Sequence, residues 1–157
     1  MRKDKVEKEK SKVYKIVEKI IELAVLLSFI ALTYFVGSHH EHWADEAQAW
    51  LLARDSSWQE LFTLHMKYEG SPVLWHVILK ALISIGLTYK YYFIVPIICT
   101  SIGVVILEFK SKMPLLIKII LPFAYYIFYQ YTIVARSYCL IFPVLMYLTC
   151  VYNDKNK

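Results

Sequence analysis

Residues 20–36 read IIELAVLLSFIALTYFV, and this stretch decides the fold class. Its residues are apolar apart from Glu22 and a few hydroxyl-bearing side chains. At about 1.5 Å of rise per residue, a helix over this stretch covers roughly 25 Å. That length is sufficient to cross the hydrocarbon core of a bilayer once the adjoining lysine-bearing flank is added. The stretch therefore predicts a first membrane-spanning helix.

A basic segment, residues 1–19, precedes this helix and interleaves Arg and Lys with a few acids. Cytoplasmic flanks of membrane helices carry an excess of Arg and Lys, so the segment predicts a cytoplasmic amino-terminus. The chain has a net charge of +5, but its other lysines are scattered among apolar runs. We therefore expect the lipid bilayer as a partner and no nucleic acid. Residues 153–157 are expected to form a cytoplasmic tail.

The rest of the chain is also rich in apolar residues, which make up 58% of the sequence. Four further apolar stretches can be recognised: Val73–Leu87, Tyr91–Leu107, Leu115–Tyr131 and Tyr138–Tyr152. Together with the first helix they predict an all-α, polytopic transmembrane bundle of four to five spans in the cell membrane. The three cysteines lie inside these apolar segments and are interpreted as packing residues.

The number of spans depends on residues 73–87. This stretch has about 15 residues, fewer than the ~17 that a spanning helix needs, and it contains His76 and Lys80. If it lies in the interface or re-enters, the lysines at 110, 112 and 118 fall on the cytoplasmic side, as the distribution of basic residues favours. We therefore prefer four spans to five.

A long polar loop, residues 37–71, follows the first helix and is expected to lie outside. Loops of this length are uncommon unless they are functional. Within it, residues 44–54 place Ala47, Trp50 and Leu51 on one helical face, which is typical of an amphipathic interfacial helix. A second short helix is predicted over residues 58–68, starting near Ser56 or Ser57 with Glu60 at the capping distance.

Asp45 and Glu46 are the leading candidates for chemistry in this loop. A carboxylate at a water–lipid boundary has one partly apolar side, which is expected to raise its pKa and to make it a usable general base. The competing interpretation is structural, since Asp45 with Gln48 three residues later resembles a helix cap. Spacing alone leaves both open.

Other polar residues have weaker signals. His39, His40, Glu41 and His42 are of metal-ligand type, but consecutive residues point in different directions, so few could bind one ion together. A divalent metal is possible but not indicated, and no cofactor is expected. Arg136 stands between two apolar runs. It is either a helix-end residue that reaches the interface or a group that grips a lipid phosphate.

Three runs in order carry a resemblance to a known family: ADEAQAWLLARD (44–55), YEGSPVLWH (68–76) and YTIVARSY (131–138). They resemble the amino-terminal part of GT-C fold membrane glycosyltransferases, related to protein O-mannosyltransferases and lipid A aminoarabinose transferases. The resemblance covers residues 20–152 and implies an inverting transfer of a sugar from a polyprenyl-phosphate donor to an external acceptor.

The resemblance also implies roles for particular residues. Asp45 would be the catalytic carboxylate with Glu46 as its neighbour, and Arg136 and Tyr138 would lie near the donor phosphate. Trp50, Glu69 and Trp75 stand in the other two runs and are assigned to substrate binding, and no metal ligand is assigned.

The chain departs from the family pattern in two ways. Ser71 replaces a family His, Val73 a Pro, and His76 a Tyr. Family members also carry more membrane helices, so the chain is expected to be truncated or to need a further membrane chain, and to be inactive alone in that case. The alternative function is that of a non-enzymatic accessory or structural membrane subunit that uses the same loop for binding.

Overall fold

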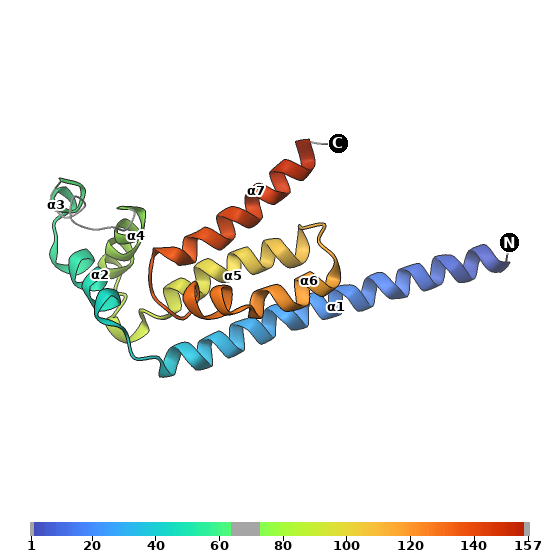
Figure 1. Ribbon diagram of the computed structural model, residues 1–157, viewed down its shortest axis with the longest axis horizontal. Coiled ribbons are helices and arrows are strands. Elements are labelled where there is room, and N and C mark those ends of the chain that lie inside the picture. Colours follow the sequence, from blue (N-terminus) through green and yellow to red (C-terminus); the bar gives the residue numbers. More distant parts are fainter. Residues whose placement is uncertain (1, 64–72, 156–157) are drawn as a thin grey trace.

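The structure is a computed structural model that describes residues 2–63 and 73–155, with side chains for residues 12–63 and 73–152. Every regular element within these ranges is a helix, which confirms the predicted all-α class. The long helices lie side by side as a bundle, and a group of shorter helices sits at one end of it (Figure 1).

Helix α1 (Arg2–His39) contains the predicted first span and continues well beyond it on the amino-terminal side. Its portion from Lys12 to His39 is long and apolar enough to cross a membrane. The described residues contain a second helix that meets the same test, Tyr89–Phe109. This second stretch comprises the 3-10 turn η2 (Tyr89–Tyr91) and helix α5 (Ile94–Phe109). These two helices are consistent with a location in a membrane.

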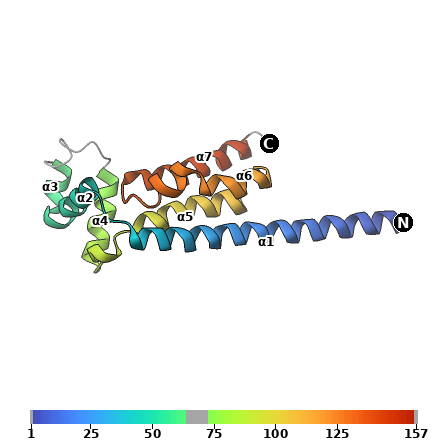
Figure 2. The ribbon, with the colours of Figure 1, turned by 60° about the horizontal axis from the view of Figure 1, so that its bottom comes forward.

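The predicted span at 115–131 is wrong as a single helix. Helix α6 (Leu115–Ile120) passes into the 3-10 turn η3 (Leu121–Phe123) and then into the π-helix η4 (Tyr126–Gln130). Pro122 has no backbone N–H for a helix ladder, and Ala124 adopts an extended conformation with ψ of 140°. The broken segment nevertheless runs back along α1 and α5 (Figure 2).

The carboxyl-terminal helix α7 (Ile141–Lys155) follows the 3-10 turn η5 (Ser137–Leu140) and packs against α5. A hydrophobic cluster joins α1, α5, η4 and α7; its buried members are Phe29, Val104, Leu107, Ile127, Phe142 and Met146. Gly103 lies where α5 and α7 come closest, because a Cβ at this position would lie 2.5 Å from Cδ1 of Phe142. The absence of a side chain there lets the two helices approach.

Two charged residues that interrupt the apolar runs, Glu22 and Lys118, pair with each other inside the bundle. The Nζ of Lys118 on α6 lies 2.5 Å from Oε1 of Glu22 on α1, and both side chains are buried. The same Nζ donates to the backbone carbonyl of Glu108 at 2.6 Å. A buried charge is tolerated when it is paired and hydrogen-bonded, so this contact explains how α1 carries an acid in its apolar run.

Three short helices gather at the end of the bundle where α1 ends and α5 begins: α2 (Ala44–Asp55), α3 (Trp58–Thr63) and α4 (Val73–Ser84) (Figure 1). Helix α4 falls below the length of a spanning helix. It packs on α2 and α3, and Nζ of Lys80 donates to the backbone carbonyl of Ser56. Residues 73–84 therefore belong to this end group and do not run along the bundle.

The start of α3 is confirmed as a capping box. The backbone N–H of Ser57 donates to Oε2 of Glu60 at 2.8 Å, and the N–H of Glu60 donates back to Oγ of Ser57 at 3.2 Å. Residues 64–68 of the predicted helix lie outside the described residues. In α2, the predicted face is wrong in part: Trp50 is buried but Leu51 is exposed, and the buried stripe is made by Glu46, Ala49, Trp50 and Ala53.

Gly103→Val is expected to destabilise the protein by about 1–3 kcal/mol, because the new side chain would overlap Phe142 and the backbone nitrogen of Pro143, 2.9 Å from the Cβ position. Thermal unfolding in detergent measures the effect. Ile102→Val on the exposed face of the same helix is the matched control. Equal midpoints for the two variants would contradict close packing of α5 on α7.

Candidate functional site

The candidate site lies in the turn between the end of α1 and the start of α2. Residues 40–43 leave the helical conformation, and α2 begins at Ala44 with Trp43 as its N-cap in an extended conformation. Glu46, at the third helical position, accepts the backbone N–H of Trp43 at 2.8 Å. The competing interpretation, in which Asp45 caps the helix with Gln48, is therefore wrong. The N-cap lies two residues earlier, at Trp43, so Asp45 lies inside the first turn of the helix, where a negative charge interacts favourably with the helix dipole.

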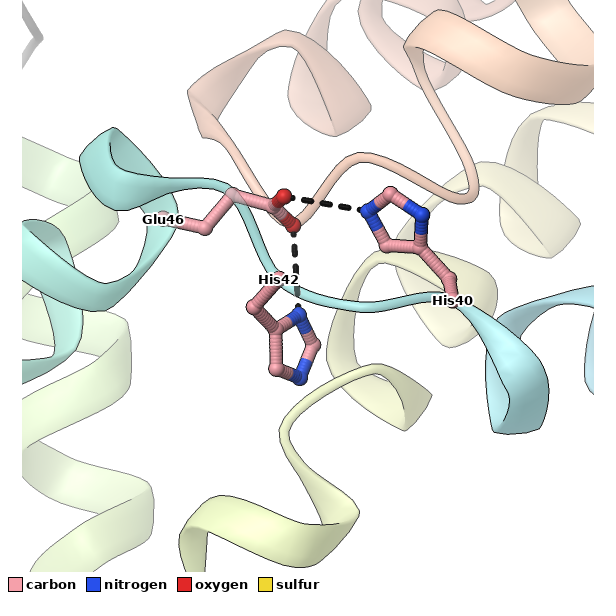
Figure 3. Close-up of side chains that lie close together, drawn as sticks. All are labelled: His40, His42 and Glu46. Atoms are coloured by element: carbon pink, nitrogen blue, oxygen red, sulfur yellow. Dashed lines mark hydrogen bonds and ion pairs between the residues drawn. The ribbon is translucent and has the colours of Figure 1, made fainter.

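Glu46 is fully buried and has four hydrogen-bond partners. Its Oε2 lies 3.1 Å from Nε2 of His40 and also accepts the Trp43 N–H. Its Oε1 lies 3.4 Å from Nδ1 of His42 and accepts the backbone N–H of Ala135 at 2.6 Å. Figure 3 shows the two imidazole rings approaching the carboxylate from different directions. One side chain thus joins α1, α2 and the segment before η5.

The pKa of Glu46 is opposite to the expectation from the sequence. Burial by itself raises this pKa, but the hydrogen bonds from His42, the two backbone N–H groups and His40 outweigh burial and lower it to about 2. The raised pKa predicted for an acid at this boundary is therefore wrong for Glu46, because donors surround the carboxylate and stabilise its charged form. Such a group is a poor general base near neutral pH.

Asp45 faces the other way and is half exposed. Its Oδ2 lies 2.9 Å from Nη1 of Arg136, and the same Nη1 donates to the Asp45 backbone carbonyl at 3.1 Å. The Asp45 side chain is 49% exposed, whereas that of Arg136 is 17% exposed. Asp45 and Arg136, both singled out from the sequence, stand 91 positions apart in the chain. In the structure they lie in direct contact, with the Asp45 carboxylate open to solvent.

The Arg136 segment is held by contacts with its neighbours. The hydroxyl of Tyr92 donates to the Ala135 carbonyl at 2.7 Å, while the Ala135 N–H points at Glu46. Thr100 also donates to the carbonyl of Tyr131 at 2.8 Å, which ties the beginning of the segment to α5. Although residues 131–136 form no regular helix, both backbone groups of Ala135 are satisfied, and Arg136 is positioned as a result.

The residues assigned to substrate binding lie in different surroundings. Trp75 is fully buried and Trp50 nearly so, and both belong to a core cluster with Tyr92. This placement favours a packing role for the two tryptophans. Tyr138 is 44% exposed, and its ring lies 6.4 Å from that of Tyr131. Glu69 lies outside the described residues.

A groove of about 660 Å³ runs along the exposed side of α2, next to α3. The residues that line it are Ala44, Ala47, Gln48, Leu51, Leu52, Asp55, Ser56 and Glu60. Its volume is in the range of small-molecule sites. The lining includes Ala44, the chain neighbour of Asp45, but neither member of the Asp45–Arg136 pair. The groove therefore lies beside the ion pair and not at it.

Sequence reasoning missed the convergence of His40 and His42 on Glu46. These histidines are two positions apart in a non-helical stretch, and side chains at i and i+2 of extended chain point to the same side. Recognising that residues 40–43 are not helical would have allowed the two histidines to be paired. No local signal could have shown that Ala135 and Tyr92 complete the site, because those contacts depend on tertiary packing.

Comparisons with known proteins add no assignment. No protein-family model matches the chain, and neither a curated protein nor a solved structure was found to be similar to it.

Glu46→Gln is expected to lower the free energy of unfolding by at least about 2 kcal/mol, because buried hydrogen bonds to a charged group are worth about 1.5–3 kcal/mol each. In the variant, the amide NH₂ replaces one carboxylate oxygen and therefore points its hydrogens at groups that donate to that oxygen in the unsubstituted protein. Chemical unfolding in detergent, followed by helical circular dichroism, measures the loss. Glu41→Gln, an exposed acid five positions earlier, is the control. Equal stability of the two variants would show that Glu46 does not hold the site together.

Proposed function

We propose that the chain is a membrane glycosyltransferase module of GT-C type, which transfers a sugar from a polyprenyl-phosphate donor to an acceptor hydroxyl outside the cytoplasm. The observation that supports this proposal best is the contact between the half-exposed Asp45 carboxylate and Arg136. An inverting transfer needs a base for the acceptor and a cation for the leaving phosphate, and the two groups are side by side.

Each member of the pair has one task in this proposal. Arg136 binds the donor phosphate through its planar fork of N–H groups. Asp45, which the phosphate displaces from Arg136, then accepts the proton of the acceptor hydroxyl. The acceptor oxygen forms a bond to the anomeric carbon from the face opposite the phosphate, and the bond from that carbon to the phosphate oxygen breaks. The products are the inverted glycoside and polyprenyl phosphate, with the proton left on Asp45.

Glu46 does not carry out proton transfer in this scheme. Its pKa of about 2 and its four hydrogen-bond partners suit it to positioning. It fixes the start of α2, on which Asp45 sits, and the backbone of Ala135, which precedes Arg136. Glu46 is thus assigned to orient the pair, a revision of the catalytic role that the resemblance implied.

The proposed topology has four spans with both termini in the cytoplasm. Helix α1 leads outward, α5 returns, the α6–η4 segment leads outward again, and α7 returns. The basic start of the chain supports a cytoplasmic amino-terminus. With this orientation the Asp45–Arg136 pair lies at the outer boundary, where a lipid-linked donor carries its phosphate.

Asp45→Asn is expected to reduce sugar transfer from a polyprenyl-phosphate donor by at least about 100-fold, the effect of removing a general base. Arg136→Lys is expected to raise the KM for the donor more than it lowers kcat, because lysine keeps the charge but loses the fork. Transfer is measured in native membranes that carry the protein together with any partner chain. Glu41→Gln is the control, since that acid is exposed and outside the pair.

Two results would contradict the assignment. Transfer by Asp45→Asn at the rate of Glu41→Gln would remove Asp45 from the reaction. Membranes with the protein that transfer no more sugar than membranes without it would exclude the enzymatic function and favour an accessory subunit.

The topology is tested by labelling single added cysteines with a reagent that does not cross membranes. Ser57→Cys in the loop is expected to be labelled on intact cells, whereas Lys112→Cys between α5 and α6 is expected to react only after permeabilisation. Both positions are exposed in the structure. The unsubstituted protein, with its three cysteines in apolar segments, gives the background. Labelling of Lys112→Cys on intact cells would overturn the four-span arrangement.

A further inference from the structure

A cluster of two imidazoles and the Glu46 carboxylate lies next to Asp45, and none of the three groups transfers a proton or binds the phosphate in the proposed reaction. The potential ligand atoms are Nε2 of His40, Nδ1 of His42 and an oxygen of Glu46, and all lie within 4.8 Å of one another. Figure 3 shows them converging from the non-helical stretch 40–43 and the first turn of α2. Two neutral histidines and a carboxylate are a common ligand set for Zn²⁺.

The distances between these atoms are close to those between neighbouring ligands of a bound ion. Zn²⁺ binds nitrogen and oxygen at about 2.0–2.2 Å, so neighbouring ligands in a tetrahedral site lie about 3.3 Å apart. The nitrogen–oxygen distances here are 3.1 Å for His40 and 3.4 Å for His42. The second exceeds the usual range of an N–H···O bond, about 2.7–3.2 Å. Each imidazole faces a different oxygen of Glu46, and the three ligand atoms lie within 4.8 Å of one another, so the side chains close in on the ion by small rotations when it binds.

The carboxylate is held in a suitable orientation by groups that an ion would leave in place. The N–H of Trp43 and the N–H of Ala135 bind one oxygen each. Such outer contacts fix metal-binding carboxylates in known sites. Replacing the two imidazole hydrogens by one Zn²⁺ leaves both backbone bonds intact and uses the lone pairs that now face the histidines.

The rings themselves have little freedom. The His42 ring lies 5.1 Å from the ring of Tyr89 and 5.2 Å from that of Tyr92. The His40 ring lies 6.0 Å from the ring of Tyr129. The His42 and His40 side chains are 12% and 7% exposed, so both rings are largely buried. Packing on aromatic rings orients both ligands before any ion arrives.

We propose that His40, His42 and Glu46 form a zinc site that fastens the end of α1 to the start of α2. Three protein ligands leave a fourth position for water. The ion has a positioning role, since it fixes the turn from which Asp45 projects. This inference rests on the His–His–Glu geometry alone and does not depend on the proposed sugar transfer.

The test uses the complete chain, purified without a histidine tag in detergent and stripped with a chelator. Titration with ZnCl₂ by calorimetry is expected to give one ion per chain, and Co²⁺ is expected to give the visible absorption of a tetrahedral complex. His40→Gln and His42→Gln are each expected to weaken Zn²⁺ binding by at least about 10-fold, the smallest effect seen even for outer-shell partners. His39→Gln is the matched control, because His39 is exposed and its ring bonds to Phe35 of its own helix.

Circular dichroism of each stripped variant establishes that its helices are intact before the titration. Stoichiometric binding that both histidine variants lose and His39→Gln retains supports the site. Unchanged binding in both His40→Gln and His42→Gln, or no saturable binding by the unsubstituted chain, overturns it. Because calorimetry detects the ion directly, an unsubstituted protein that binds zinc but transfers no sugar in membranes would contradict the proposed function and leave the zinc site standing.

Discussion

The arrangement of the chain around the start of α2 depends on one buried carboxylate, that of Glu46. A charged group removed from water is costly unless donors replace the lost hydration. Here the donors come from two histidines after α1, from the cap of α2 and from the backbone of Ala135. Segments far apart in the sequence must therefore meet at one point, since separation of any of them would leave charge or donors unsatisfied.

A second buried charge restrains the bundle at the other end of α5. Lys118 of α6 meets Glu22 of α1 and the carbonyl of Glu108 near the end of α5. Apolar packing between helices has no direction, so it sets their separation more than their register. There are two buried polar contacts, that of Glu46 near one end of α5 and that of Lys118 with Glu22 near the other. Together they fix the register of α1, α5 and the segment that includes α6 relative to one another. The close approach at Gly103 then brings α7 onto the same scaffold.

The sequence predicted what local chemistry controls. The apolar length of residues 20–36 predicted the first long helix, and the spacing of Ser57 and Glu60 predicted the cap of α3, because both depend on neighbouring residues. The break inside 115–131 was missed because hydropathy counts apolar residues and ignores the missing N–H of Pro122. The buried face of α2 was predicted in part only, because apolar periodicity could not show that an acid, Glu46, would face the core.

The candidate site separates the two acids that stand together in the sequence. Adjacent residues on a helix point about 100° apart, so burial of Glu46 directs Asp45 outward. The position of Asp45 is thus fixed by its neighbour, while its own carboxylate stays half exposed beside Arg136. Arg136 has the same relation to Ala135, whose N–H bonds Glu46 and whose carbonyl accepts the Tyr92 hydroxyl. One buried group therefore orients both members of the Asp45–Arg136 pair, so that two charges of opposite sign are held in place through the backbone contacts of the residues next to them.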